Sequence, residues 1–301
     1  MINPDKRVLE NLLGLYNKGF LKEALDQSEK LINDFPKSFF LWNLIGAINQ
    51  KLHQLKKAEK GFRKASVLNP LYPDSFNNLG VTLKDQGKFI EAIDSFKKAI
   101  SLKPDYVQAY NNMANALQEQ DKLKDSIKTY KKAISIKPDY IEAYINMANV
   151  LQLSGSFKEA IEAYRKIISL NSNYVEAYFN LGLALKSISK YEEAVEVYKL
   201  AISLRPNYLE AYNNMANALQ AQGRFEEAIK AYKKAISLKP DYTEAYYNLA
   251  NTLQEHGKFK EAIKTYKQAI SLKPDYIEAY NNMANALQEQ GNFEEAVKGY
   301  E

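Results

Sequence analysis

Asparagine side chains recur in this sequence at intervals of 34 residues. The decapeptide AYNNMANALQ occurs at 109–118, 211–220 and 279–288, and the copies lie three and two times 34 residues apart. A carboxamide offers one hydrogen-bond acceptor and two donors. It can therefore pair with both the N–H and the C=O of an extended peptide, whatever side chains that peptide carries. The chemistry that this spacing predicts is recognition of a polypeptide backbone.

Counted from residue 5 in steps of 34, two positions of the repeat carry these asparagines. Position 6 is asparagine in the third to ninth repeats, at Asn78, Asn112, Asn146, Asn180, Asn214, Asn248 and Asn282. Position 9 is asparagine at Asn115, Asn149, Asn217, Asn251 and Asn285. Glutamine recurs at position 12, at Gln118, Gln152, Gln220, Gln254 and Gln288. Asparagine is about 0.6 kcal/mol less favourable than alanine in a helix, so its retention in register indicates a function, which we expect to be peptide binding.

The spacing of packed helices suits this function. Neighbouring helices lie about 8–10 Å apart and an extended chain advances about 3.3 Å per residue, so one asparagine would meet roughly every third peptide bond. Two alternatives remain open at this point. The position-6 asparagines could bond to the neighbouring repeat and be structural, or recent duplication could have carried them along.

The repeats that hold these side chains follow one another without a gap. They run over 5–38, 39–72, 73–106, 107–140, 141–174, 175–208, 209–242, 243–276 and a partial 277–301, after a short tail at 1–4. Proline at position 32 ends the second helix of a repeat because its ring cannot continue one. Glycine at position 15 is expected just after the first helix, at Gly87, Gly155, Gly223, Gly257 and Gly291.

The start of each first helix shows a capping-box pattern. Asp139 followed by Glu142 predicts that the aspartate caps the helix and the glutamate reaches back to it. The pattern also accounts for the acidic residues at position 2, which are Glu142, Glu176, Glu210, Glu244 and Glu278. An acidic edge that attracts basic peptides is the alternative interpretation of these glutamates.

The apolar residues follow a helical period. Positions 4, 7, 8 and 11 share one face of the first helix, as in Tyr110, Met113, Ala114 and Leu117. The combination of an aromatic residue at 4, a small one at 8, Ala at 20, an aromatic at 24, Ala at 27 and Pro at 32 resembles the tetratricopeptide repeat. The second repeat shows it at Trp42, Gly46, Ala58, Phe62, Ala65 and Pro70.

This resemblance covers residues 5–301. It implies an all-α, right-handed superhelical solenoid of helix pairs whose first helices line a concave groove. The position-6 series is also similar to the asparagine ladder in the repeat region of protein O-GlcNAc transferases, which hold substrate peptides by their backbones. Glu10 and Leu44 break the series in the first two repeats, so we do not extend the ladder to them.

The sequence offers no set of residues for catalysis. It has no cysteine, and His53 and His256 are its only histidines, so we expect no enzyme activity, no cofactor and no metal site. Lysines at positions 25 and 26 lie among Glu and Ser and are expected on a solvated face, so nucleic acid is not an expected partner. No segment is apolar enough for a signal peptide or a membrane span, and the expected location is the cytoplasm.

The last residues leave one point open. The sequence stops at position 25 of the ninth repeat, with Tyr280, Met283, Phe293, Ala296 and Tyr300 uncapped. Either the chain is a fragment of a longer protein, or self-association covers this end. The expected function is that of a protein–protein interaction scaffold that binds extended peptide segments in a groove lined by Asn and Gln. The alternative is the substrate-docking arm of a larger transferase, such as a glycosyltransferase or sulfotransferase.

Overall fold

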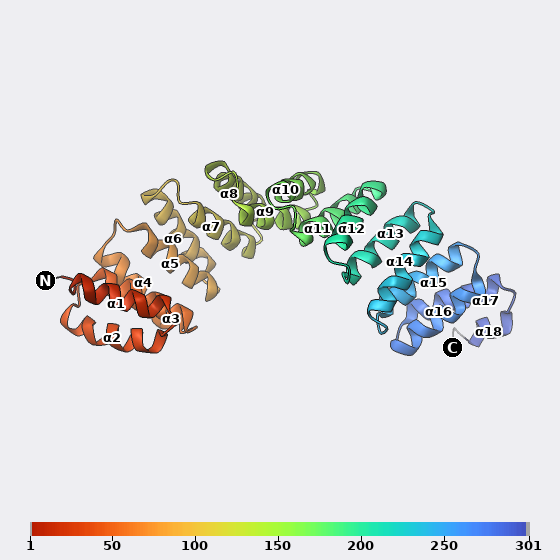
Figure 1. Cartoon of the computed structure of the whole chain (residues 1–301), viewed down its shortest axis with the longest axis horizontal. Helices are drawn as coiled ribbons and strands as arrows, with labels where there is room; N and C mark the ends of the chain where they lie inside the picture. The colour runs from red at the N-terminus through yellow and green to blue at the C-terminus, as the bar shows by residue number, and fades with distance from the viewer. Residues whose placement is uncertain (1, 299–301) are drawn as a thin grey trace. The chain divides into compact units, whose positions relative to one another are not determined.

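The structure, a computed structural model, describes residues 2–298, with side chains up to residue 296. These residues form eighteen α-helices and no β-strand (Figure 1). The chain divides into two compact parts, an N-terminal part (Met1–Ser154) with α1–α9 and a C-terminal part (Gly155–Glu301) with α10–α18. None of the helices in the described range is long and apolar enough to cross a membrane.

The odd-numbered helices come first in each repeat and are called A helices here. They are α1 (Lys6–Asn17), α3 (Phe39–Lys51), α5 (Pro73–Asp85), α7 (Val107–Glu119), α9 (Ile141–Leu153), α11 (Val175–Ser187), α13 (Leu209–Ala221), α15 (Thr243–Glu255) and α17 (Ile277–Glu289). The even-numbered B helices are α2 (Leu21–Asp34), α4 (Leu55–Leu68), α6 (Phe89–Leu102), α8 (Leu123–Ile136), α10 (Phe157–Leu170), α12 (Tyr191–Leu204), α14 (Phe225–Leu238), α16 (Phe259–Leu272) and α18 (Phe293–Lys298).

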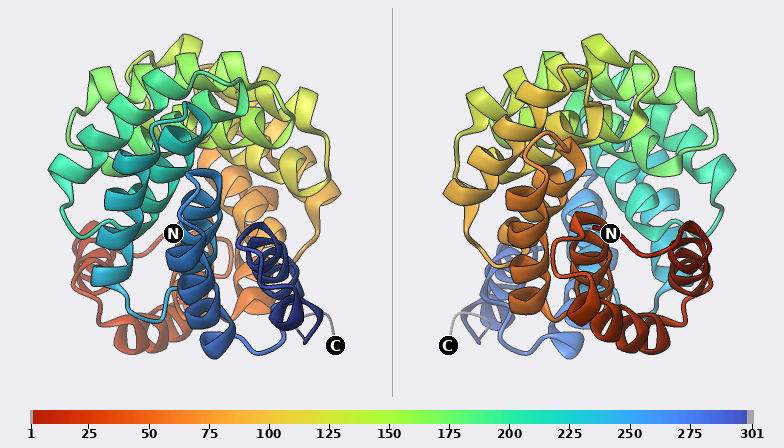
Figure 2. Two further views of the ribbon diagram at one scale, coloured as in Figure 1. Left: turned by 90° about the vertical axis from the view of Figure 1, so that its right-hand side faces the viewer. Right: turned by 90° about the vertical axis from the view of Figure 1, so that its left-hand side faces the viewer.

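Within each part, every helix packs on its neighbours in the chain (Figure 2). In the N-terminal part, α3 and α4 pack together, α4 packs on α5, and this order continues to α9. The A helices also touch the next A helix, from α3 to α9 in one part and from α11 to α17 in the other. Each part is therefore a stack of helix pairs with the A helices along one face. This confirms the prediction of an all-α solenoid.

The core of each pair lies where the small residue at position 8 meets the aromatic ring at position 24. Ala114, Tyr130 and Ala133 are fully buried in the fourth repeat. The contact is tightest where position 8 is glycine, because a Cβ atom on Gly46 would lie 2.8 Å from the ring of Phe62. Close approach of the two helices thus requires a small residue at this position.

The turn from A helix to B helix has the same backbone conformation at position 15 in every repeat. Residues at position 15 have positive φ, and Gly87, for example, has φ 75°. The N–H of Gly87 bonds to Lys84 O and that of Lys88 bonds to Leu83 O, which is the Schellman arrangement. The predicted C′ glycines are confirmed. His53, Asp121 and Ser189 adopt the same conformation without being glycine, with φ of 56–59°.

The predicted capping boxes are wrong. From α5 onward the A helices begin after the tyrosine at position 34, and Tyr140, the N-cap of α9, makes no side-chain cap hydrogen bond. Asp139 instead lies in a turn closed by Tyr140 N–H to Lys137 O, and its own carbonyl accepts from Ile141. Because this turn uses the backbone of Asp139, the helix starts one residue later than the side-chain pattern indicated. The apolar end that was expected around Tyr300 lies outside the described residues.

Candidate functional site

The position-6 asparagines lie on successive A helices. Three are in the N-terminal part, on α5, α7 and α9, and four are in the C-terminal part, on α11, α13, α15 and α17. All seven are half-buried. Because adjacent A helices within a part are in contact, each part carries its own row of carboxamides, with one position-6 asparagine per repeat from the third repeat onward.

Most of these asparagines bond to the preceding repeat. Asn112 donates from Nδ2 to Asn77 Oδ1 at 3.1 Å, and Asn146 donates to Asn111 Oδ1 at 3.2 Å. In the C-terminal part, Asn248 donates to Asn213 Oδ1 at 3.4 Å, and Asn282 donates to the hydroxyl of Tyr247 at 3.0 Å. One N–H of each carboxamide is therefore used to hold its side chain in place.

In three of these bonds the acceptor is an asparagine at position 5, a residue that sequence reasoning did not single out. Asn77, Asn111 and Asn213 are 7%, 1% and 1% exposed. A buried carboxamide needs partners for its donors as well. Asn111 donates to Glu142 Oε1 at 3.1 Å, and Asn213 donates to Glu244 Oε1 at 3.2 Å. The signal in the sequence was the Asn-Asn pair itself, which places one carboxamide inward and the next outward.

At position 2, Glu142 and Glu244 have a role other than the two that the sequence suggested, which were helix capping and an acidic edge. Glu142 and Glu244 accept from the preceding A helix rather than capping their own. Glu142 also accepts from the hydroxyl of Tyr140 at 3.0 Å. Each glutamate and the asparagine four residues later thus hold the same buried carboxamide of the preceding repeat from both sides.

The position-9 asparagines serve the tyrosines at position 24. Tyr232 donates its hydroxyl to Asn217 Oδ1 at 2.5 Å, and Tyr266 donates to Asn251 Oδ1 at 2.5 Å. Tyr130 makes the same bond to Asn115. Burial raises the pKa of Tyr232 above its ordinary value, so the hydroxyl stays a neutral donor. The oxygen atoms of Asn115, Asn217 and Asn251 therefore each accept a hydrogen bond from within their own repeat.

The sixth repeat departs from this arrangement. Leu183 stands at position 9, and the buried hydroxyl of Tyr198 has no hydrogen-bond partner among the described residues. Lys186 replaces glutamine at position 12 and donates from Nζ to Asn214 Oδ1 at 2.9 Å. Desolvation by burial lowers the pKa of Lys186. This repeat keeps Asn180 at position 6 but interrupts the carboxamide series at positions 9 and 12, and it places a half-buried ammonium group beside Asn214.

The two histidines belong to turns, one in each part. His53 occupies position 15, and the ring of His256 lies 5.4 Å from that of Phe225. Within the part of the chain that the structure describes, no group of three or more His, Cys, Asp or Glu side chains could hold a metal ion. The carboxamide rows are the site with the most repeated geometry.

Comparison with known proteins identifies the family. A profile described as the tetratricopeptide repeat matches residues 105–171, 139–207, 166–241 and 207–275, and two related profiles of the same repeat match 82–121 and 253–300. These matches cover more than half of the chain, which therefore belongs to the tetratricopeptide repeat (TPR) family. Its fold is that of a TPR scaffold for protein interaction. No curated protein matches the chain.

Solved structures resemble the chain in fold. YrrB, described as a TPR protein with an unusual peptide-binding site, is 24% identical, with 62% of this chain and 96% of YrrB covered and a TM-score of 0.54. MamA is 32% identical, with 51% of this chain and 90% of that one covered and a TM-score of 0.50. The C-terminal part of a TPR protein from Cytophaga hutchinsonii is 19% identical, with coverages of 78% and 96% and a TM-score of 0.69.

Proposed function

We propose that this TPR scaffold binds extended peptide segments of partner proteins along its A helices, with the position-6 asparagines contacting the peptide backbone. The observation that carries the proposal is the state of these carboxamides. Asn112, Asn146 and Asn248 each use one N–H for the preceding repeat. Their Oδ1 atoms and second N–H groups have no partner among the described residues, and the side chains are half-exposed. Those atoms match the N–H and C=O of a peptide bond.

The inter-repeat bonds support this function rather than competing with it. A free asparagine side chain loses rotamer freedom when it binds, and that loss weakens the complex. Asn112 and Asn146 are already fixed by Asn77 and Asn111. A peptide would therefore meet carboxamides that are oriented in advance, which favours backbone recognition.

The position-9 asparagines take a secondary role in this proposal. Asn217 and Asn251 accept from buried tyrosines through their oxygen atoms, and we assign their N–H groups to peptide carbonyl groups. We assign the same role to the rest of this series, Asn115, Asn149 and Asn285. YrrB shows that a stack of this kind can carry a peptide-binding site, but the case for this chain rests on its own side chains.

The same surface would serve two biological settings. In one, the chain acts as a free-standing scaffold; in the other, it is the substrate-docking arm of a larger transferase. The intact mass of the endogenous polypeptide distinguishes them, because a mass well above 34.4 kDa would favour the second setting.

A triple variant tests the proposal within one part of the chain. Asn180, Asn214 and Asn248 are replaced together by alanine, and binding of a fluorescent, proline-free peptide of about 15 residues is measured by anisotropy. Each lost hydrogen bond is worth about 1 kcal/mol, so we expect affinity to fall at least about tenfold. Unchanged affinity in a folded triple variant would overturn the proposal.

The control carries three substitutions in the same repeats but on the B helices. Ser203, Ser237 and Ser271 are exposed and bond only to carbonyls of their own helices. Their replacement by alanine should leave peptide affinity unchanged. Urea unfolding of both variants separates lost binding from lost stability, because Asn248 also bonds to Asn213.

A further inference from the structure

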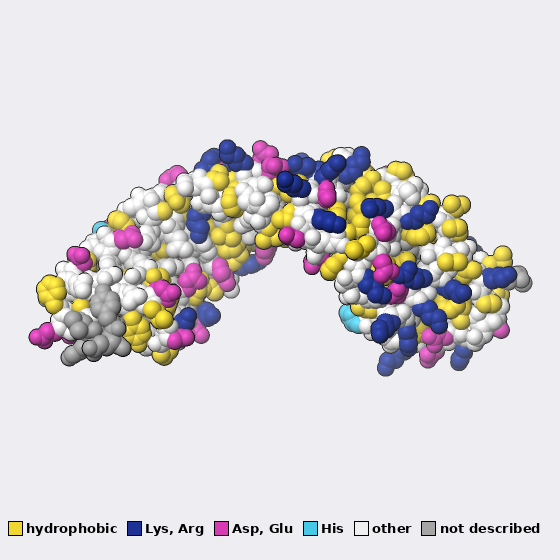
Figure 3. Space-filling view, turned by 180° about the vertical axis from the view of Figure 1, so that it is seen from behind, with side chains coloured by type: hydrophobic (Ala, Val, Ile, Leu, Met, Phe, Trp, Pro, Cys, Tyr) yellow, Lys and Arg dark blue, Asp and Glu magenta, His cyan; other side chains and the backbone are white. Residues whose placement is uncertain are grey.

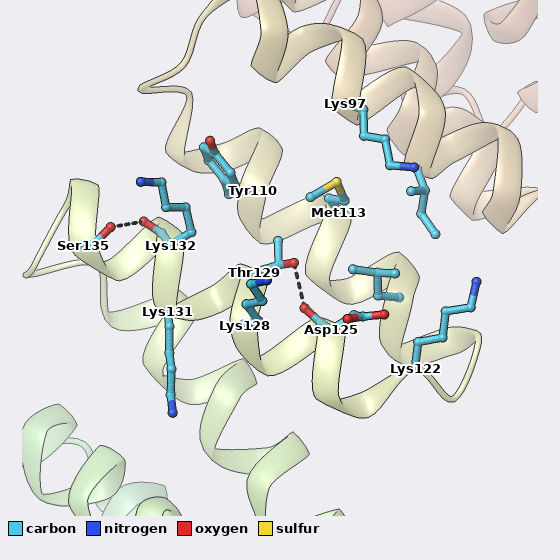
Figure 4. A pocket seen from close by; sticks show the side chains of 12 residues that line it. Lys97, Tyr110, Met113, Lys122, Asp125, Lys128, Thr129, Lys131, Lys132 and Ser135 are labelled. Carbon is cyan, nitrogen blue, oxygen red and sulfur yellow. Dashed lines mark hydrogen bonds between the residues drawn. The ribbon is translucent and has the colours of Figure 1, made fainter.

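A hollow of about 710 Å³ lies on the other side of the N-terminal part, away from the carboxamide row. Its walls are α6 and α8 and its floor is α7 (Figure 4). Tyr110, Met113 and Leu117 supply the apolar floor. The rim carries a single carboxylate, Asp125, and the lysines Lys97, Lys122, Lys128 and Lys132, whereas the side chain of Lys131 points away from the floor (Figure 4).

The preceding repeat provides an internal comparison. The equivalent hollow between α4 and α6 is smaller, at about 400 Å³, and its charges balance, with Arg63 and Lys98 against Glu91 and Asp94. Arg63 pairs with Glu91 across it at 2.5 Å. In the α6/α8 hollow, Asp125 replaces the longer glutamate, and Lys97 pairs with Asp94 of its own helix at 3.5 Å. Lys128 stands where the smaller hollow has Asp94.

The two hollows therefore differ in electrostatics and in access. The smaller hollow is charge-neutral and bridged by an ion pair, whereas the larger one has a strongly positive rim above an apolar floor. On the face that Figure 3 shows, Lys and Arg side chains are frequent and Asp and Glu side chains lie between them. Positive rims of this kind attract acidic partners.

We propose that the α6/α8 hollow docks an acidic amphipathic helix of a protein partner, in addition to any peptide on the A helices. Two parallel helical walls with an apolar floor are the setting in which helix-in-groove recognition operates. An apolar side chain of the partner contacts Tyr110 and Met113, and its acidic residues pair with Lys97, Lys128 and Lys132. Methionine in the floor lets the surface adapt to the shape of the incoming side chain.

The depth of the floor favours a protein helix over a lipid surface. Leu117 and Ile93, both part of the lining, are only 9% and 6% exposed. A protruding side chain can reach them, but the flat boundary of a bilayer cannot. Membrane binding instead uses apolar side chains that project outward from a basic face.

The test uses the whole chain and a synthetic amphipathic helix. The probe is a peptide of about 14 residues, roughly 20 Å long as a helix, with a leucine stripe flanked by glutamates and a photoreactive leucine in the stripe. We expect binding that weakens as salt is raised, with cross-links on α7 and α8. The charge-swapped peptide, with lysines for glutamates, should not bind.

Three variants locate the site. Lys97→Glu, Lys128→Glu and Lys132→Glu combined should weaken binding at least about tenfold. Thr129→Trp, which fills the hollow without a charge change, should weaken it as well. The matched control, Lys22→Glu with Lys30→Glu and Lys37→Glu, makes the same change in net charge on exposed lysines of the first repeat and should bind like the original chain.

The outcomes that overturn the inference are equally specific. Equal weakening by the control would show that only net charge matters. Absence of acidic-peptide binding at low salt would contradict the inference. Cross-links that lie only on A helices, with none on α8, would contradict it as well. Binding of anionic phosphatidylserine vesicles without binding of the peptide would assign the basic rim to a lipid surface instead.

Discussion

Asparagine makes three different sets of contacts in this chain, depending on its position in the repeat. At position 5 it is buried and held by the next repeat, as Asn111 is held by Glu142 and Asn146. At position 6, Asn112, Asn146 and Asn248 each anchor one N–H and leave the other polar atoms without a partner among the described residues. At position 9 it accepts from a buried tyrosine. A carboxamide has enough donors and acceptors to serve structure and ligand binding together.

One prediction at this scale uses the same substitution at two equivalent tyrosines. Tyr198 has a buried hydroxyl without a partner among the described residues, whereas Tyr232 donates to Asn217 and Gln220. Tyr198→Phe should raise the free energy of unfolding by about 1 kcal/mol, because it removes an unsatisfied polar group. Tyr232→Phe should lower it by about 1 kcal/mol, because it breaks a satisfied bond.

Chemical denaturation of the two variants checks whether their free energies of unfolding change in opposite directions. Each acts as the control for the other, since both remove one oxygen atom from the same place in a repeat. A loss of stability on Tyr198→Phe would mean that its hydroxyl is satisfied in solution, for instance by water.

At the scale of helices and turns, the sequence signals that act through backbone restriction were the reliable ones. Proline at position 32 and glycine at position 15 act through their own backbone restrictions, so Gly87 and Gly155 were predicted correctly. Asp139 was misassigned because its carbonyl and the hydroxyl of Tyr140 are engaged in ways that a side-chain pattern does not show. Asn111 was overlooked because its partners lie on the next repeat, 31 and 35 residues away.

The turn at position 15 yields a prediction about backbone strain. Gly223 has φ 71° and open space around it. Gly223→Ala should destabilise the chain by about 1 kcal/mol, because L-residues are disfavoured in this conformation. Gly14 lies inside α1 with nothing within 4 Å of an added Cβ, so Gly14→Ala should stabilise by up to about 1 kcal/mol. Thermal unfolding distinguishes the two, and equal shifts would contradict the account.

A pH dependence is expected where α4 meets α6. Burial raises the pKa of Glu59, but hydrogen bonds from Lys88 and Arg63 outweigh this effect and lower the pKa from 4.5 to about 2. Both contacts are 2.8 Å long. Since the folded pKa is depressed, the stabilisation is present above pH 4.5 and is lost as the pH falls towards 2.

Replacement of the carboxylate tests this assignment. The variant Glu59→Gln should be less stable than the original chain at neutral pH, and the difference should shrink between about pH 4.5 and 2. Urea titrations across that range measure it. A difference that does not change with pH would mean that the charge of Glu59 does not stabilise the fold.

At the scale of the whole molecule, the chain repeats one binding element many times within each of its two parts. Solenoids are stabilised mainly by contacts between neighbouring repeats, and here the inter-repeat bonds pass through the same carboxamides that we propose as ligand contacts. The periodicity of the sequence was enough to predict the stack and the rows. It was not enough to predict which atoms of each carboxamide remain available, because that depends on the preceding repeat.

The central claim is that the scaffold recognises peptide backbone. The most direct measurement is calorimetric titration of the original chain with two matched peptides, one unmodified and one N-methylated at alternate residues. Backbone recognition predicts at least about tenfold weaker binding of the methylated peptide, since its N–H donors are lost, and similar affinity for peptides with altered side chains. Equal binding of both peptides, with strong dependence on side chains, would contradict the claim.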